Sequence, residues 1–217
     1  MSLRYLLCLA NSKKYGERCI AGIELEKSGN IFRVVRIGDQ PKWIRPVSED
    51  EFGAISESIA GKFALLDVIE IMITNSVPLG YQSENVRFKE NSLIRVAQLQ
   101  PSHELLRLAV DKNAQNLFGN SGKAVSREKI STVSYSLMCI KPQEVAFSEQ
   151  TSVSGYNQIR CTFLFQNQHY DLPVTDILFC REFKHGKRIG QNIYLTISLG
   201  LEFEGWHYKL VAGVILF

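Results

Sequence analysis

The segment LLCLANSKKYGERCIAGIEL, residues 6–25, decides how the chain is expected to fold. An apolar run from Tyr5 to Ala10 gives way to polar residues at 11–18, and the chain becomes apolar again from Cys19 to Leu25. Two apolar runs of strand length around a short polar segment are typical of neighbouring β-strands. We therefore predict a strand, an exposed basic loop and a second strand.

Further strand signals follow along the chain, separated by turns rich in Gly, Asn, Asp or Pro. In the first half they lie at residues 31–37, 65–74 and, more weakly, 86–88. In the second half they lie at residues 133–140, 158–165, 170–174, 194–199 and 206–216. Several short strands with turns between them indicate small β-barrels rather than a parallel α/β sheet.

Two helices are predicted. The longer spans Ser102 to Phe118, because Ser102 is a suitable N-cap and apolar residues recur at helical spacing until the glycines at 119–122. The shorter begins at an N-cap on Ser48 and runs through Ser58. The expected organisation is mainly β: a first barrel over residues 1–100, a connecting helical segment over 101–122 and a second barrel over 123–217.

Positive charge is concentrated at the start of the chain. The 217 residues carry a net charge of +3, too small to make the whole protein a polyanion binder. Residues 1–48 alone carry +5, whereas residues 49–100 carry −4. A local excess of this kind is expected of a phosphate-binding face. The alternative interpretation is a solvated surface with an uneven charge distribution.

The candidate binding residues lie in and near this basic segment. Cationic side chains and backbone amides of the loop can meet phosphate oxygens, Trp43 offers a face for base stacking, and Arg45 can pair with a phosphate. A second basic group precedes the strand at 194–199. The full set is Asn11, Ser12, Lys13, Lys14, Arg18, Trp43, Arg45, Lys184, Lys187 and Arg188. The alternatives are that Trp43 plugs the barrel core and that the second group belongs to a solvated loop.

No motif for catalysis, a cofactor or a metal is found in the sequence. Neither a Walker A loop nor a dinucleotide-binding glycine fingerprint occurs, and the GNSGK segment at 119–123 is expected only to stop a helix. His169 with Asp171 and Asp176 suggests strand-end polar pairing rather than metal ligation. The five cysteines form no C-x-x-C, which favours a reducing cytoplasm. The N-terminus does not resemble a signal peptide, and no segment is long enough to span a bilayer.

Segments throughout the chain resemble the bacterial family known as the dual OB-containing domain. They are LANSKKYGERCIAGIEL (9–25), KWIRPVS (42–48), LLDVIEI (65–71), YQSENVRF (81–88), YDLPVTD (170–176) and SLGLEFEGWHYKLVAGVI (198–215). The resemblance implies two tandem barrels of the oligonucleotide/oligosaccharide-binding (OB) type and brings no reaction with it. In the last segment Phe203, Trp206 and Tyr208 are expected to fill a barrel end rather than to stack on bases.

The favoured functional hypothesis is a cytoplasmic, non-enzymatic module that binds single-stranded or unwound nucleic acid beside a nucleic-acid-processing system. One alternative is a protein-interaction adaptor that holds a partner through YQSEN and the loops of the second half. Another is an enzyme or sensor for a nucleotide or small phosphate compound, with Asn11, Ser12, Lys13 and Arg18 as its phosphate pocket.

Overall fold

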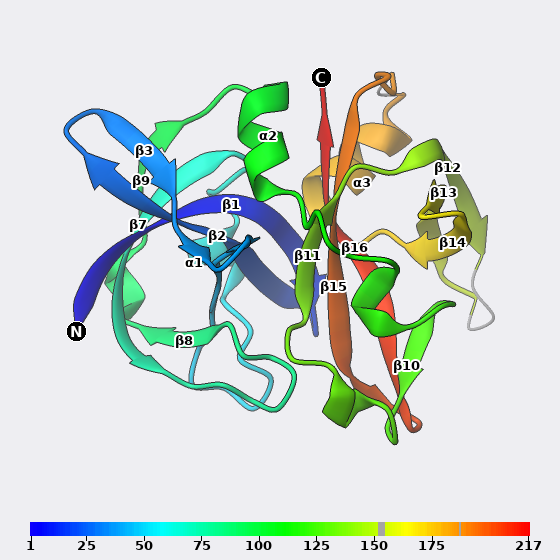
Figure 1. Cartoon of the computed structure of the whole chain (residues 1–217), viewed down its shortest axis with the longest axis horizontal. Coiled ribbons are helices and arrows are strands. Elements are labelled where there is room, and N and C mark those ends of the chain that lie inside the picture. The colour runs from blue at the N-terminus through cyan, green and yellow to red at the C-terminus, as the bar shows by residue number, and fades with distance from the viewer. Residues whose placement is uncertain (152–154, 187) are drawn as a thin grey trace.

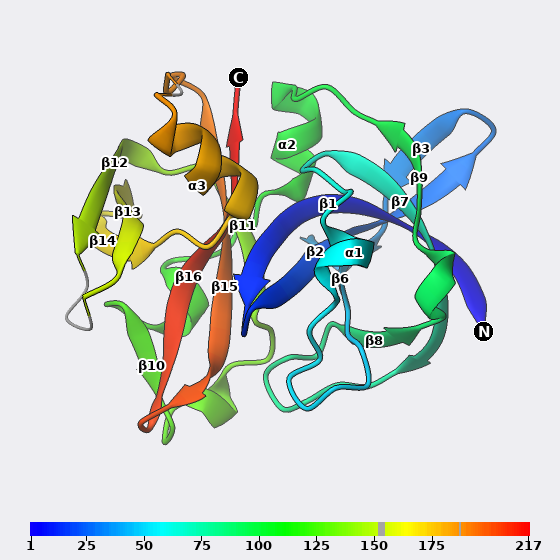
Figure 2. The ribbon, with the colours of Figure 1, turned by 180° about the vertical axis from the view of Figure 1, so that it is seen from behind.

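The computed structural model describes residues 1–151, 155–186 and 188–217. Two β units lie side by side, one built from each half of the chain (Figure 1). The β1–β2 hairpin of the first unit reaches the β15–β16 hairpin of the second, as both views show (Figures 1 and 2). Among the described residues, no helix has the length and apolar character that crossing a membrane requires.

The first unit is a closed barrel of five strands. Its strands are β1 (Ser2–Lys14), β2 (Glu17–Ser28), β6 (Trp43–Pro46), β7 (Asp67–Ser76) and β8 (Asn85–Phe88). They pair in the order β1, β2, β6, β8, β7, and β7 pairs again with β1 to close the ring. Only β6 and β8 run parallel within this ring. The smaller elements are β3 (Ile31–Val34), β4 (Arg36–Ile37), β5 (Gln40–Pro41), β9 (Ile94–Gln98), α1 (Glu57–Ala60) and a 3-10 turn at Glu90–Ser92.

The first hairpin is longer and tighter than the sequence predicts. The expected loop over residues 11–18 shrinks to Tyr15 and Gly16, whose φ angles are 47° and 88°. Two successive positive φ angles are the geometry of a type I′ turn, whose twist matches the twist of the strands it joins. Lys14 pairs with Glu17, and Lys13 with Arg18, so polar residues extend both strands beyond the barrel core. The predicted loop was wrong in extent because a two-residue turn is enough to reverse the chain.

The barrel interior is apolar. Its side chains come from the barrel strands, α1 and the segments between them: Leu6, Cys8, Ile20, Ile44, Ile55, Ala60, Phe63, Ile69, Ile71 and Leu93. The β-branched run in β7 supplies two of these, Ile69 and Ile71, at the period of two that places alternate residues on one face of a strand.

The second unit is a half-barrel made of two sheets. One sheet contains β10 (Ala124–Ser126), β16 (Trp206–Leu216), β15 (Ile193–Phe203) and β11 (Leu137–Ile140), in that order. The other contains β12 (Gln143–Thr151), β13 (Asn157–Phe165) and β14 (Gln168–Pro173). A bridge between Val174 and Val211 links them, and a shared core that includes Phe163, Leu172 and Val211 lies between them. Short 3-10 turns at Leu117–Gly119 and Ile130–Thr132 and the helix α3 (Ile177–Lys184) complete this unit. The prediction of a mainly β fold with two OB-like barrels is confirmed.

The outer face of the first barrel is packed against the second unit. The residues of β1 and β2 that contribute are Leu7, Leu9, Ala10, Ala21, Ile23 and Leu25. They meet Leu137, Cys139, Tyr194, Ala212 and Ile215 of the second unit, and Leu106 and Ala109 from the connecting segment. Where β16 crosses β1, a Cβ added to Gly213 would lie 2.1 Å from the carbonyl oxygen of Leu9. The two units therefore share one tightly packed apolar interface.

The helices differ most from prediction. α2 spans His103–Ala109 with the expected cap, because the Ser102 hydroxyl accepts a 3.1 Å hydrogen bond from the Leu105 amide. It ends well before Phe118 because the Asp111 amide donates to the Cys139 carbonyl at 2.9 Å, which draws the chain onto β11. The predicted helix over 48–58 is wrong: residues 49–52 form a bend and a turn, after which Gly53 has φ 63° and donates to the Asp50 carbonyl at 3.1 Å, and within this range only Glu57 and Ser58 are helical. Helix α3 was not predicted.

The GNSGK segment has a role that differs from the predicted helix stop. Its backbone carbonyls face Lys209, whose Nζ donates to Asn120 at 2.7 Å and to Gly122 at 2.8 Å. Lys209 is fully buried, and burial lowers its pKa to about 8. Because carbonyl oxygens rather than amides point to the same place, the segment binds the buried ammonium group of Lys209 and is not a phosphate loop.

Asp176 joins three elements of the two units. Its carboxylate accepts 3.0 Å hydrogen bonds from the amide of Phe179, which caps α3, and from the amide of Val214 in β16. Its backbone also bridges to Ser12 of β1. Among the described residues no group of His, Cys, Asp and Glu could hold a metal. Its polar role is thus that of a helix N-cap rather than the expected pairing at a strand end.

The buried carboxyl of Asp176 makes stability depend on pH. Burial raises its pKa to about 6, although hydrogen bonds from the Phe179 and Val214 amides oppose that shift. The folded state then holds a proton that the unfolded state releases near pH 4, so this group lowers the unfolding free energy as pH rises from about 4 to about 6. We expect the unfolding free energy of wild type minus that of Asp176→Asn to fall by roughly 2 to 3 kcal/mol across this window. Urea titrations of both proteins at several pH values measure this difference in unfolding free energy. A difference that does not change with pH would contradict the prediction.

Candidate functional site

The structure divides the predicted site residues among several places. Four of them line one pocket between the two units: Ser12, Lys13, Lys14 and Arg45. Asn11 and Arg18 border a different pocket beside α1, and Trp43 lies in a third. The sequence thus located the basic hairpin but did not show which of its side chains share a surface.

The pocket that holds the four residues, here called the inter-barrel pocket, has a volume of about 250 Å³. The tip of the β1–β2 hairpin forms one wall, and the outer side of the β15–β16 hairpin forms another. Gln82 reaches it from the loop at 77–84, which joins β7 to β8. That loop is fixed on the second unit, since the Tyr81 hydroxyl donates to the Gly200 carbonyl at 2.7 Å. The remaining lining residues are Tyr15, Cys19, Ser198, Leu199, Gly200, Leu201, Tyr208 and Leu210.

The lysines of the inter-barrel pocket carry charge that the described residues do not balance with an ion pair. Lys13 is exposed and Lys14 is half-buried, and neither forms a salt bridge within the described part of the chain. Burial lowers the pKa of Lys14, and the positive charge of Arg45 lowers it further, whereas Cys19 and Asp50 oppose the shift. A half-buried ammonium beside a second cation favours an anion as its partner.

Arg45 is not available to a phosphate in the way the sequence suggested. Its side chain is 2% exposed, and its Nη2 lies 3.1 Å from Oε1 of Glu84, which is 4% exposed. The Ser136 hydroxyl donates to the same Glu84 oxygen, and Arg45 Nη2 also reaches the Ser198 hydroxyl at 3.4 Å. This correction has a simple cause: a buried guanidinium needs a carboxylate, and the loop at 77–84 provides one. Arg45 therefore contributes to the pocket as a fixed, paired charge.

Arg18 and Asn11 also have internal partners. Arg18 forms a bidentate ion pair with Glu57 of α1, in which Nη2 donates to Oε1 at 2.6 Å. Asn11 donates to the carbonyls of Ala60 and Phe63 at 2.9 and 2.8 Å. The expected role of both as exposed phosphate ligands is corrected, because they hold α1 against the hairpin. The Arg18 guanidinium also lowers the pKa of Glu57.

The other predicted residues lie apart from the inter-barrel pocket. Trp43 is half-buried, packs against the inter-unit core and lines a pocket of about 410 Å³ with Tyr135. Lys184 ends α3 and lies 3.3 Å from Glu149, so it belongs to a helix rather than to the expected loop. Arg188 is exposed, and Lys187 lies outside the described residues. Trp43 therefore does not join the lysines in one surface.

A pair of exposed aromatic rings beside the lysines was missed by the sequence analysis. Tyr15 is 62% exposed and Phe52 is 38% exposed, and their rings stack with centroids 4.1 Å apart. Tyr15 also has a positive φ, a conformation that bulky residues rarely adopt, so the turn holds this ring outward at some conformational cost. The available signal was the position of Tyr15 in the middle of SKKYGER.

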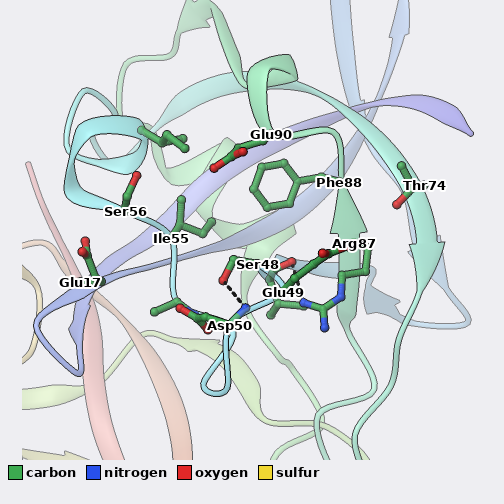
Figure 3. Close-up of a pocket in the computed structure, with 13 residues that line it drawn as sticks. Glu17, Ser48, Glu49, Asp50, Ile55, Ser56, Thr74, Arg87, Phe88 and Glu90 are labelled. Atoms are coloured by element: carbon green, nitrogen blue, oxygen red, sulfur yellow. Dashed lines mark hydrogen bonds between the residues drawn. The ribbon is translucent and has the colours of Figure 1, made fainter.

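A second pocket of the first barrel has the wrong charge for a polyanion (Figure 3). It has a volume of about 610 Å³, and Glu17, Glu49, Asp50 and Glu90 line it against a single arginine, Arg87. Most of these residues come from the segment 49–100 that carries the negative charge. The turn of the first hairpin separates the two pockets, since Tyr15 lines the inter-barrel pocket and Glu17 lines the acidic one.

Comparison with known proteins gives the family. The family model described as "Dual OB-containing domain" matches residues 4–214, nearly the whole chain. The chain belongs to this family. No curated protein matches the sequence.

Among the solved structures that this dual-OB chain resembles distantly is a murine DNA-binding protein bound with double-stranded DNA, with 8% identity and a TM-score of 0.34 over 100% of this chain and 98% of that one. The p204 HINb domain has 10% identity and a TM-score of 0.35, over 99% of this chain and 97% of that one. The tetrameric p202 HIN2 domain has 9% identity and a TM-score of 0.31, over 100% of this chain and 92% of that one. With TM-scores below 0.5, these likenesses carry no functional argument.

The dual-OB arrangement leaves one end of the first barrel accessible. Ala21 and Ile23 of β2, whose side chains point away from the barrel interior, are covered by the second unit. The turn at Tyr15–Gly16 and the loop at 77–84 remain at the open end, and both border the inter-barrel pocket. In this family member Lys13, Lys14 and Tyr15 therefore lie together at the barrel end.

Proposed function

We propose that this protein binds single-stranded or unwound nucleic acid, with a backbone phosphate in the inter-barrel pocket. The observation that carries the proposal is the combination of Lys13 and Lys14, without ion pairs in the described part of the chain, and the exposed Tyr15–Phe52 stack beside them. Cations contact phosphates and aromatic faces stack on bases, which is the usual chemistry of single-strand binding.

The position of these groups on the barrel supports the proposal. OB-folds bind oligonucleotides or oligosaccharides at the face of their second and third strands and at the loops that join strands 1–2 and 4–5. Here those loops are the Tyr15–Gly16 turn and residues 77–84, because β1, β2, β6, β7 and β8 are the five barrel strands in chain order. The second unit covers part of the outer face of β2, so a ligand is expected to bind at the two loops.

The pocket size favours a polymer over a small phosphate compound. Pockets that enclose small ligands usually measure about 300–1,000 Å³, and the inter-barrel pocket of about 250 Å³ lies below that range. It can hold one phosphate with part of a sugar, while neighbouring nucleotides lie outside. The binding of a mononucleotide as tightly as an oligonucleotide would instead favour the alternative of a nucleotide sensor.

A salt titration of oligonucleotide affinity tests the proposal. For single strands, log K falls with log salt at a slope of about −0.7 for each phosphate contacted. We expect Lys13→Gln with Lys14→Gln to flatten the slope by about 0.7, because the one phosphate held in the pocket loses its cations. We expect Tyr15→Ala to weaken binding by roughly 1 to 3 kcal/mol and to leave the slope unchanged, because stacking carries no charge. Fluorescence anisotropy of a labelled oligonucleotide measures both.

The matched control is the pair Lys89→Gln with Lys112→Gln, which removes the same charge from two exposed lysines that do not line the pocket. The slope of log K against log salt for this control variant is expected to stay close to that of wild type. If the wild-type protein binds no oligonucleotide at low salt, the proposal is wrong. If the control pair flattens the slope as much as the Lys13/Lys14 pair, the site is misplaced.

A further inference from the structure

The β15–β16 hairpin carries an exposed aromatic row that continues from the inter-barrel pocket. Tyr208 lines the pocket, and Trp206 lies two residues nearer the hairpin tip. Phe203 pairs with Trp206 across the hairpin. Phe203 is 63% exposed and Trp206 is 46% exposed, so the expectation that these two rings fill a barrel end is wrong, whereas Tyr208 is half-buried.

The alternation of burial along β16 places these rings on one face. His207 and Lys209 are buried in the second unit, whereas Trp206, Tyr208 and Leu210 are more exposed. Alternate residues of a strand point to opposite sides, so Trp206 and Tyr208 face the same side as the pocket. The spacing of two residues in a strand separates them by roughly 6.6 Å.

The neighbouring strand places only small residues beside the two rings. Tyr208 pairs with Ala124 of β10, and Trp206 pairs with Ser126. Both neighbours are small, so they do not shield the aromatic faces. The turn of the hairpin, Glu204 and Gly205, has two positive φ angles, the type I′ geometry also seen at Tyr15–Gly16. Two tight hairpins, one from each unit, thus present aromatic rings around one basic pocket.

We propose that one nucleic-acid strand runs from the first hairpin across the inter-barrel pocket and along the β15–β16 hairpin, with bases stacked on Tyr208, Trp206 and Phe203. This inference rests on the proposed function and adds to it that both units contact the same strand. Continuity with the lysine-lined pocket identifies the occupant, because Lys13 and Lys14 favour a polyanion at one end of the row. Exposed aromatic faces suit the bases of the next nucleotides.

The two tryptophans of the chain, Trp43 and Trp206, allow a direct test by fluorescence. In Trp43→Phe, emission reports on Trp206 alone. We expect a twelve-nucleotide oligonucleotide to quench it with the same midpoint that anisotropy gives, and a dinucleotide to leave it unchanged. Trp206→Phe reports on Trp43 and is expected to show little quenching. If Trp43→Phe does not fold, the difference between wild type and Trp206→Phe gives the same signal.

Affinity provides a second readout. We expect Phe203→Ala with Trp206→Ala to weaken binding of the twelve-nucleotide oligonucleotide about tenfold or more and to leave dinucleotide binding and the salt slope unchanged. The control is Ile31→Ala, an exposed apolar residue on the β2–β3 hairpin at the opposite side of the molecule (Figure 1).

The two proposals fail in different ways. Binding by anisotropy with no change in Trp206 emission, and with wild-type affinity in the double variant, would overturn the aromatic row and leave the pocket standing. Absence of any oligonucleotide binding at low salt would overturn the proposed function, and this inference with it. The exposed rings would then be better explained as a contact for a protein partner.

Discussion

Replacing Gly213 with alanine is expected to destabilise the protein by about 4 kcal/mol, because it forces a side chain into the tightly packed interface between the two units. A Cβ at this position would lie 2.1 Å from the carbonyl oxygen of Leu9 and 3.1 Å from the carbonyl carbon. Backbone atoms of β1 cannot rotate away as a flexible side chain does. The strand would have to shift, and with it the apolar interface between the two units.

Urea denaturation of Gly213→Ala measures the effect, and Gly190→Ala provides the control. A Cβ on Gly190 would meet no atom closer than 3.5 Å, and its φ is not positive, so the substitution is expected to change stability by less than about 0.5 kcal/mol. Equal stabilities of the two variants would show that β16 does not cross β1 as closely as described. A decreased slope of unfolding free energy against urea would indicate that the units have separated.

Much of the fold could be predicted from local patterns because most of its strands contain apolar runs bounded by clear turns. The strand expected at 206–216 spans the same residues as β16, and the resemblance to the dual OB-containing domain supplied the topology. The strand β12 was missed because its sequence, QEVAFSEQT, is mostly polar and exposed. Such a strand is held by its partner β13 rather than by its own apolar pattern.

The helices could not be placed because long-range contacts override local propensity. The periodicity of Leu106, Val110 and Ala114 predicted one long helix, yet the Asp111 amide pairs with Cys139 of β11 instead. Conversely, α3 begins at an N-cap, Asp176, whose sequence context had suggested only a strand end. Each case depends on a partner that is distant in the sequence.

Part of the candidate site could be predicted, and the rest could not because it depends on contacts between residues distant in the sequence. Lys13 and Lys14 were identified by charge, and they do share a pocket. The stack of Tyr15 on Phe52 and the pairing of Arg45 with Glu84 join residues that no local pattern connects. Sequence shows where charge is concentrated, but burial decides which charges remain available to a ligand.

The second large effect is expected at the buried ion pair. Arg45→Met should destabilise the protein by about 3 to 5 kcal/mol, because it leaves the Glu84 carboxylate buried without its cation. Glu84→Gln should also destabilise, since it leaves the guanidinium without its carboxylate but keeps an acceptor for the Ser136 hydroxyl. The double variant is expected to lose clearly less than the sum of the two, with a coupling of about 2 kcal/mol. A double-mutant cycle by urea denaturation measures it.

The control cycle uses the exposed pair Lys184 and Glu149, whose side chains are 46% and 44% exposed and lie 3.3 Å apart. Water screens this pair, so Lys184→Met is expected to cost at most about 1 kcal/mol. If Arg45→Met lowers the unfolding free energy no more than Lys184→Met does, Arg45 and Glu84 do not form a buried pair.

The same variants separate a structural role of Arg45 from a ligand-binding role. Because Glu84 already balances its charge, Arg45→Met should leave the salt slope of oligonucleotide binding close to that of wild type wherever the variant is folded. Lys14→Gln should reduce that slope while costing little stability, since Lys14 has no ion pair in the described part of the chain. The opposite pattern would mean that the phosphate displaces Glu84 from Arg45, and the inter-barrel pocket would then open on binding instead of receiving its ligand preformed.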